Sequence, residues 1–126
     1  MNQDEKFPKQ LRLRKQSEFE AVFREEAFAA DRVLVIHARH NGLPFSRLGL
    51  SISRRVGNAV VRNRWKRTIR EAFRKNRSKL PAGLDLVVRP RKGATCDYAD
   101  VVQSLLGLTK RIAKKFQRDF AAKENR

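Results

Sequence analysis

The sequence predicts an α/β fold, in which a small mixed four-stranded sheet packs with three helices in the order αβββαβα. Apolar residues recur at helical spacing in three segments, and short β-rich runs bounded by turn signals lie between them. The chain of 126 residues, 40% of them hydrophobic, is long enough for a modest core. We therefore expect one domain spanning 1–126, with segments 1–10 and 121–126 poorly ordered.

The first helix is expected to begin at Ser17, because Ser17 and Glu20 have the spacing of a capping box. It should continue to about Phe28. Phe19 and Phe23 are one turn apart and share one helix face, which is typical of a helix that packs on a sheet.

Three of the strands can be placed by their residues. A β-rich run extends from Arg32 to Arg39, and Asn41-Gly42-Leu43-Pro44 is a turn signal after it. From Arg47 to Ser53, large apolar residues alternate with small ones, which predicts a strand with one apolar and one small polar face. A further strand, from Leu84 to Val88, ends at Arg89-Pro90.

The second helix should begin after Asn58, a favoured N-cap residue behind Gly57, and end by Pro81. Its apolar stripe is predicted to be buried, and it consists of Val61, Trp65, Ile69, Ala72 and Phe73. The last helix should extend from Tyr98 or Asp100 to about Phe116. Its buried stripe comprises Val101, Leu105, Leu108, Ile112 and Phe116.

Positive charge dominates the chain, with 30 Lys and Arg against 13 Asp and Glu and a formal net charge of +17. Nucleic acid is therefore the leading partner, and an anionic membrane is the weaker option. No apolar segment approaches the length of a membrane span, and polar residues follow Met1, so we expect a cytoplasmic protein. The single Cys96 excludes an intrachain disulfide and a cysteine metal cluster.

The second helix concentrates this charge on its polar side. Glu71 is the one acid within it and can pair with Arg67 or Lys75. Because one carboxylate cannot neutralise the array, we expect an external polyanion to do so. The predicted phosphate-binding residues are Arg54, Arg55, Asn58, Arg62, Asn63, Arg64, Lys66, Arg67 and Arg70. The alternative is a solubilising, solvated face.

The sequence offers no catalytic constellation of its own. His37 and His40 are three residues apart, on opposite faces of an extended segment, which is unsuitable for chelation. Cys96 has no evident partner base, and the carboxylates are few and scattered. We therefore predict no catalytic residue and no metal-ligating residue in the chain, and a reaction carried out elsewhere.

The run Arg62-Asn63-Arg64-x-Lys66-Arg67-x-x-Arg70-Glu71-x-Phe73-Arg74, after Gly57-Asn58-Ala59-Val60, resembles the signature of the bacterial ribonuclease P protein component. The resemblance extends roughly from Leu11 to Phe116. It implies a left-handed βαβ crossover around the basic helix, where the general rule gives a right-handed one. It also implies that an RNA subunit holds the catalytic Mg²⁺ ions.

The resemblance further implies a cleft for the single-stranded 5′ leader of precursor tRNA, next to Phe19 and Phe23. Aromatic side chains beside cations hold unpaired bases without strict sequence choice. The small Ser51 and Ser53 leave room on one face of the sheet. Simple core packing of the two phenylalanines is an equal alternative.

The function that follows is an RNA-binding subunit of ribonuclease P, assisting the catalytic RNA in endonucleolytic removal of the 5′ leader. The expected partners are ribonuclease P RNA and precursor tRNA, with no membrane and no required protein partner. A basic ribosomal protein with no part in cleavage is the alternative. A DNA-binding protein ranks lower, because no second helix is arranged for a helix-turn-helix.

Overall fold

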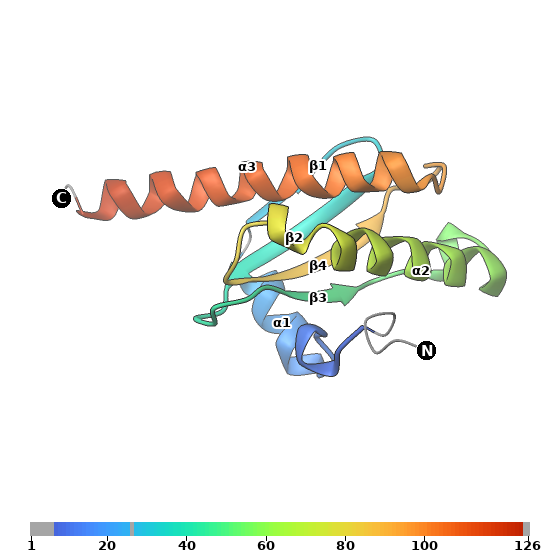
Figure 1. Cartoon of the computed structure of the whole chain (residues 1–126), viewed down its shortest axis with the longest axis horizontal. Coiled ribbons are helices and arrows are strands. Elements are labelled where there is room, and N and C mark those ends of the chain that lie inside the picture. Colours follow the sequence, from blue (N-terminus) through green and yellow to red (C-terminus); the bar gives the residue numbers. More distant parts are fainter. Residues whose placement is uncertain (1–6, 26, 125–126) are drawn as a thin grey trace.

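The computed structural model describes residues 7–25 and 27–124, which form two layers of helices around one sheet (Figure 1). Helices α2 and α3 cover one face of the sheet, and α1 lies on the other. The helices are α1 (Gln16–Arg24), α2 (Ala59–Lys75) and α3 (Tyr98–Glu124). The strands are β1 (Ala27–Ala30), β2 (Leu34–His40), β3 (Arg47–Leu50) and β4 (Leu84–Pro90). The predicted α/β class and the order αβββαβα are confirmed.

The sheet is mixed, with strand order β1-β2-β4-β3. Strand β2 runs antiparallel to both β1 and β4, whereas β3 runs parallel to β4. The turn at 41–44 therefore does not close a hairpin, because β4 lies between the two strands that it joins. Helix α2 connects the parallel pair β3 and β4, and the handedness of this crossover stays a prediction.

The alternation of β4 divides the apolar residues between two cores. Leu84, Leu86 and Val88 face α2 and α3 in the larger core, and Val87 faces α1 in a small one. The larger core also contains Trp65 and Phe73, which are 2% and 1% exposed. The predicted stripe of α2 is thus confirmed from Trp65 to Phe73, whereas Val61, at the first turn, is exposed.

The first helix is shorter than predicted. Its first turn is capped by Glu18, whose Oε1 accepts hydrogen bonds from the backbone N–H groups of Arg14 and Lys15, both at 2.9 Å. The predicted Ser17–Glu20 capping box is therefore wrong. The helix ends at Arg24, and the chain then forms β1, which pairs with β2. Phe28 lies in this strand, which the sequence pattern did not place.

The ends of the described chain carry more structure than expected of segments 1–10 and 121–126. Phe7 is 8% exposed and stacks on Phe73 with ring centroids 5.5 Å apart. Helix α3 continues to Glu124, beyond its predicted end near Phe116. Residues 1–6 and 125–126 lie outside the described residues. Strand β3, by contrast, ends three residues before the predicted Ser53.

A fully buried carboxylate connects α1 to the sheet. Asp85 in β4 accepts two hydrogen bonds from the guanidinium of Arg47, each 2.8 Å, and one of 2.9 Å from Asn41. Arg39 lies 3.5 Å from the same carboxylate. Burial alone would raise the pKa of Asp85, but the hydrogen bonds from Arg47 and Asn41 outweigh it and hold the pKa below its ordinary value.

Arg47 also binds a residue of α1. Its Nη1 donates to Glu18 Oε2 at 3.2 Å. Glu18 also accepts the two backbone hydrogen bonds at the start of α1, and these are the main cause of its lowered pKa. One chain of charges thus links β4, β3 and the first turn of α1.

We predict that Asp85→Asn lowers the free energy of unfolding at pH 7 by about 3 kcal/mol, because it removes the buried partner of Arg47 and leaves that guanidinium only the partly exposed Glu18. The folded pKa of Asp85 is depressed, so its contribution is present above the unfolded value of about 4. It is lost as the pH falls through the folded pKa. Urea titrations should therefore show the gap between wild type and variant shrinking below about pH 4.

Asp119→Asn provides the matched control, since Asp119 is an exposed acid on α3. It should remain close to wild type at every pH. A gap for Asp85→Asn that stays constant down to about pH 2 would contradict the predicted role of the ionised carboxylate.

Candidate functional site

Local contacts stabilise the turn from which α2 begins. Asn58 is the N-cap, as predicted, and its side chain accepts a 3.0 Å hydrogen bond from Val61 N. Gly57 has φ +156°, and a Cβ there would lie 2.8 Å from Val61 Cγ1. Arg62 Nη1 donates to Gly57 O at 2.9 Å. Asn58 and Arg62 therefore also stabilise this turn.

A cationic groove of about 820 Å³ lies between the N-terminal segment and α2. We call it the α2 groove. From α2 it is lined by Asn63, Lys66, Arg67, Arg70, Glu71 and Arg74, and from the N-terminal segment by Phe7, Pro8, Lys9 and Arg12. The contact between Phe7 and Phe73 holds the two walls together below the charged side chains.

Like charges face each other across this groove. Burial, and to a smaller extent the nearby Arg12, lower the pKa of Arg70. The guanidinium of Arg12 lies 5.2 Å from the ring centre of Phe7, and its buried Nε has no hydrogen-bond partner among the described residues. Glu71 pairs with Arg74, whereas the sequence had suggested Arg67 or Lys75. An anion between Arg12 and Arg70 would relieve this repulsion.

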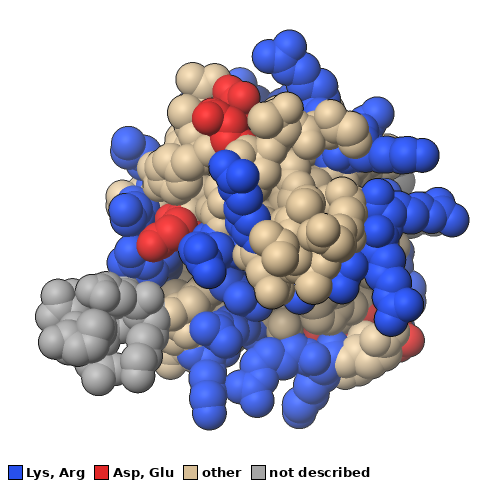
Figure 2. All heavy atoms as spheres, turned by 90° about the vertical axis from the view of Figure 1, so that its right-hand side faces the viewer, with Lys and Arg blue, Asp and Glu red and all other residues tan. Residues whose placement is uncertain are grey.

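The structure brings together only part of the predicted phosphate-binding set. Asn63, Lys66, Arg67 and Arg70 line the groove, whereas the remaining members, Arg54, Arg55, Asn58, Arg62 and Arg64, do not. Arg54 and Arg55 form an exposed 3₁₀ turn just before α2. Figure 2 shows Lys and Arg side chains projecting around the end of the molecule that faces the viewer, with few acidic side chains among them.

Sequence reasoning missed Lys9 and Arg12 as members of the groove. A partial signal was present in Leu11-Arg12-Leu13-Arg14, where basic residues alternate with apolar ones that can anchor the segment. In the structure Leu11 packs in the larger core and Leu13 in the small one. Leu11 and Leu13 are buried, and Arg12 forms a parallel bridge with Leu48. The segment is thereby fastened to the edge strand β3, next to α2.

The two phenylalanines of α1 have different environments. Phe19 packs with Leu13, Val22 and Val87 in the small core. Gly49 makes room for it, since a Cβ there would lie 2.8 Å from Phe19 Cζ. Phe23, in contrast, is 42% exposed. Packing therefore accounts for Phe19, while Phe23 is available to a ligand.

An aromatic patch, formed by Phe23, Phe28 and His37, lies on the α1 face of the sheet. The ring centroids of Phe23 and Phe28 lie 4.9 Å and 5.6 Å from that of His37. Phe28 is 57% exposed. Burial, and secondarily Arg89, lower the pKa of His37, so the imidazole is neutral at pH 7. Phe28 was not among the predicted cleft residues.

The predicted serines lie at the other side of the same face. Ser51 N donates to Val88 O at 3.0 Å, so the chain continues beside β4 for one residue past β3. Ile52 packs against the larger core, and Ser51 therefore faces the α1 side. Ser53 is exposed and precedes the 3₁₀ turn that leads into α2.

The other polar candidates do not gather into a site. His40 contacts Phe116 on the opposite face from His37, and Cys96 Sγ lies 3.4 Å from Thr68 Oγ1. Within residues 7–25 and 27–124, no group of three or more His, Cys, Asp or Glu side chains could hold a metal ion. In the same part of the chain, no helix is long and apolar enough to cross a membrane.

Comparison with known proteins identifies the family. The family model "Ribonuclease P" matches residues 7–113. The ribonuclease P protein component of Thermotoga maritima is 40% identical over 113 residues, covering 86% of this chain and 97% of that protein. The one from Brevibacillus brevis is 44% identical over 102 residues, covering 79% and 81%.

Solved structures agree with these relatives. The ribonuclease P protein from Thermotoga maritima superposes with a TM-score of 0.74 at 39% identity, covering 79% of this chain and 96% of that one. The Staphylococcus aureus protein gives a TM-score of 0.71 at 32% identity, covering 82% and 95%. The chain therefore has the fold of these proteins.

We predict that Arg70→Gln weakens RNA binding and lowers the slope of log affinity against log salt by about 0.9, as expected for one lost phosphate contact. The melting temperature should not fall, because the substitution removes the repulsion with Arg12. Filter binding over a salt series and thermal melts measure both effects. Lys75→Gln removes the same charge from an exposed position of α2 outside the groove. Equal losses of affinity for the two variants would contradict a specific role of the groove.

Proposed function

The chain belongs to the ribonuclease P protein family, and from this premise we propose how it acts on RNA. As a bacterial-type protein component it is part of an endoribonuclease holoenzyme and partners ribonuclease P RNA. The proposal is that it assists this RNA in removing the 5′ leader of precursor tRNA, in the cytoplasm. It does so by binding the RNA subunit on one surface and the single-stranded leader on another.

The α2 groove is the proposed docking surface for the RNA subunit. The observation that carries this assignment is the unneutralised pair Arg12 and Arg70, held together in a groove of further cations. Planar guanidinium groups form bidentate hydrogen bonds with phosphate, and folded RNA presents phosphates at high density. Arg54, Arg55 and Arg64 lie outside the groove and extend the same cationic surface around the start of α2.

The aromatic patch, with Phe19, Ser51 and Ser53 around it, is the proposed leader cleft. Exposed Phe23 and Phe28 offer rings on which unpaired bases can stack, and Arg89 lies close enough to influence His37. Of the two ring nitrogens of His37, Nδ1 is the one that can reach a base edge, because Nε2 is buried without a hydrogen-bond partner among the described residues. Phe19 supports this surface from below and positions α1 on the sheet.

The Mg²⁺ ions of the reaction are proposed to be held mainly by RNA. Three carboxylates near the proposed surfaces already have basic partners, since Asp85 and Glu18 bind Arg47 and Glu71 binds Arg74. Such groups do not suit a hard cation that requires free oxygen ligands. The contribution of the protein is to reduce phosphate repulsion between two large RNAs, which raises the affinity for substrate and for Mg²⁺.

Reconstitution tests this proposal directly. Titrating the protein into a bacterial ribonuclease P RNA at low Mg²⁺ should strongly stimulate leader release from a precursor tRNA. Arg12→Gln combined with Arg70→Gln should raise the protein concentration needed for half-maximal stimulation, by roughly tenfold or more if two phosphate contacts are lost. The rate of leader release at saturating protein should be unchanged, because neither residue takes part in the cleavage reaction. Loss of the saturating rate would contradict a docking role.

We also predict that Phe23→Ala weakens binding of precursor tRNA by the holoenzyme by about 1–3 kcal/mol, the usual value of one stacked base. Mature tRNA, which lacks the leader, should bind unchanged. Equilibrium binding of both RNAs measures the difference. Tyr98→Ala removes an aromatic ring of similar exposure at the start of α3 and should change neither affinity. Equal losses for precursor and mature tRNA would assign Phe23 to folding.

A further inference from the structure

Helix α3 is longer than its packing against the sheet requires. Ile112 is its last buried residue, and Phe116 is half-buried against His40, with ring centroids 4.4 Å apart. The helix then continues to Glu124, which at 1.5 Å per residue adds about 12 Å beyond Phe116. Figure 1 shows this end projecting past the sheet. The family model ends at residue 113, so it does not include this extension.

One side of the helix carries three exposed cations, Arg111, Lys114 and Arg118, which we call the α3 stripe. Their spacing of three and four residues places them in one row, about 5–6 Å apart. None of the three has an ion-pair partner among the described residues. Together with Gln117 and Ala121 they bound a shallow hollow along the helix. A row of long cationic side chains at this spacing suits a chain of phosphates.

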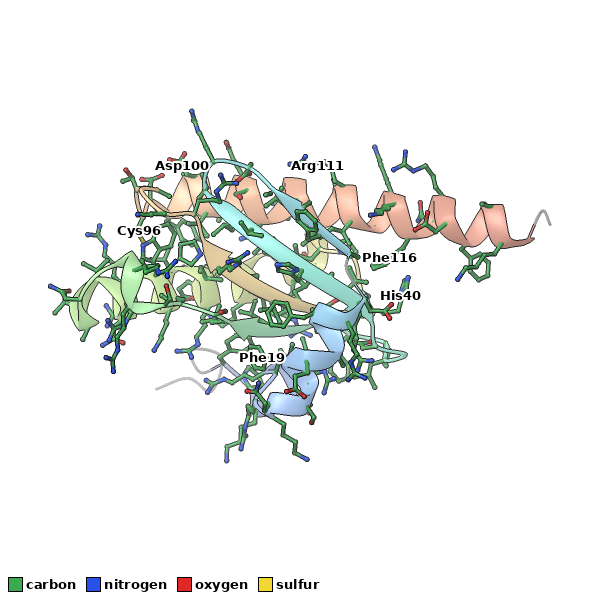
Figure 3. All side chains as sticks on the ribbon, turned by 180° about the vertical axis from the view of Figure 1, so that it is seen from behind. Phe19, His40, Cys96, Asp100, Arg111 and Phe116 are labelled. Carbon is green, nitrogen blue, oxygen red and sulfur yellow. The ribbon has the colours of Figure 1, made fainter. Side chains whose placement is uncertain are left out.

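The stripe lies at the β1 edge of the sheet. Arg111 Nη2 donates a 3.2 Å hydrogen bond to Ala30 O, at the end of β1. The same strand carries Phe28 of the aromatic patch. Figure 3 looks onto the α1 face and shows α3 passing along this edge and continuing beyond it. The opposite edge is β3, which leads to the 3₁₀ turn and to α2.

We propose that the α3 stripe binds phosphates of the distal leader, which are the nucleotides farther from the cleavage site than those over the aromatic patch. This inference rests on the proposed function. A single strand that leaves the RNA subunit near α2 crosses the sheet from the β3 edge to the β1 edge. At this edge the stripe lies beside the strand that carries Phe28, since Arg111 contacts the end of β1. Contacts to backbone phosphates require no particular leader sequence.

Leader length provides the test. Holoenzyme binding is measured with precursors that carry leaders of about 5 and about 15 nucleotides, both within the site sizes of single-strand binders. The test variant combines Lys114→Ala with Arg118→Ala, and Arg111 is kept because it contacts β1. Lys79→Ala with Lys123→Ala is the control, since both residues are exposed cations and neither lies on the side of α3 that carries the stripe.

Wild type should bind the long-leader precursor more tightly than the short-leader one. The test variant should lose this gain and bind both with the short-leader affinity, and its salt slope for the long leader should fall by about 1.4. The control should keep the gain. Alanine favours helix, so α3 is expected to persist in both variants, which circular dichroism checks.

Three results would overturn the proposal: no length-dependent gain in wild type, an unchanged gain in the test variant, or equal losses for both leaders. Weaker binding of the test variant to ribonuclease P RNA alone would also overturn it, because the stripe would then contact the RNA subunit. Failure of the proposed function gives a different result. In that case wild type would bind the short-leader precursor no better than mature tRNA.

Discussion

The buried ion pair between Asp85 and Arg47 is the interaction on which the position of α1, and with it the proposed leader cleft, depends. A fully buried carboxylate is stable only when its oxygens accept hydrogen bonds. For Asp85 the donors are Arg47 in β3 and Asn41 in the turn after β2. The register of β4 between β2 and β3 is thereby fixed. Because Arg47 also binds Glu18, α1 is held over the same end of the sheet. The aromatic patch lies at the C-terminal end of α1, where Phe23 contacts His37 of β2.

The two faces of the sheet perform different tasks. The face under α2 and α3 contains nearly all the large buried side chains, including Trp65 and Phe73, and provides most of the apolar burial. The other face has only the small core beneath α1, built from Leu13, Val22 and Val87. Stability can therefore come from one side, while the other keeps exposed rings and a neutral histidine available for a proposed ligand.

Sequence patterns predicted what local chemistry determines. The N-cap at Asn58 and the buried stripe from Trp65 to Phe73 follow from helical spacing and capping preference, and both are confirmed. Strand β1 was part of the predicted order but was not located in the sequence, because Ala27–Ala30 has no β-rich pattern and forms through pairing with β2. The groove was half predicted, because the position of Arg12 opposite Arg70 depends on the long-range contacts of Phe7 and Leu11. Contacts between residues far apart in the sequence cannot be predicted from local patterns, whereas the buried face of a helix can be predicted from the spacing of its apolar residues.

The same long-range contacts connect folding to RNA binding. The N-terminal wall of the α2 groove is fastened by apolar contacts at Phe7 and Leu11, while its charged side chains repel those of α2. Held together in this way, Arg12 and Arg70 would give the proposed anion site a preorganised geometry, because the cost of bringing the two charges together is already met in the free protein. RNA that occupies the groove removes the repulsion and, by mass action, stabilises the folded chain, by about 2.7 kcal/mol at one hundred times its dissociation constant. We therefore expect a chain with a net charge of +17 to be more stable in the proposed complex than alone.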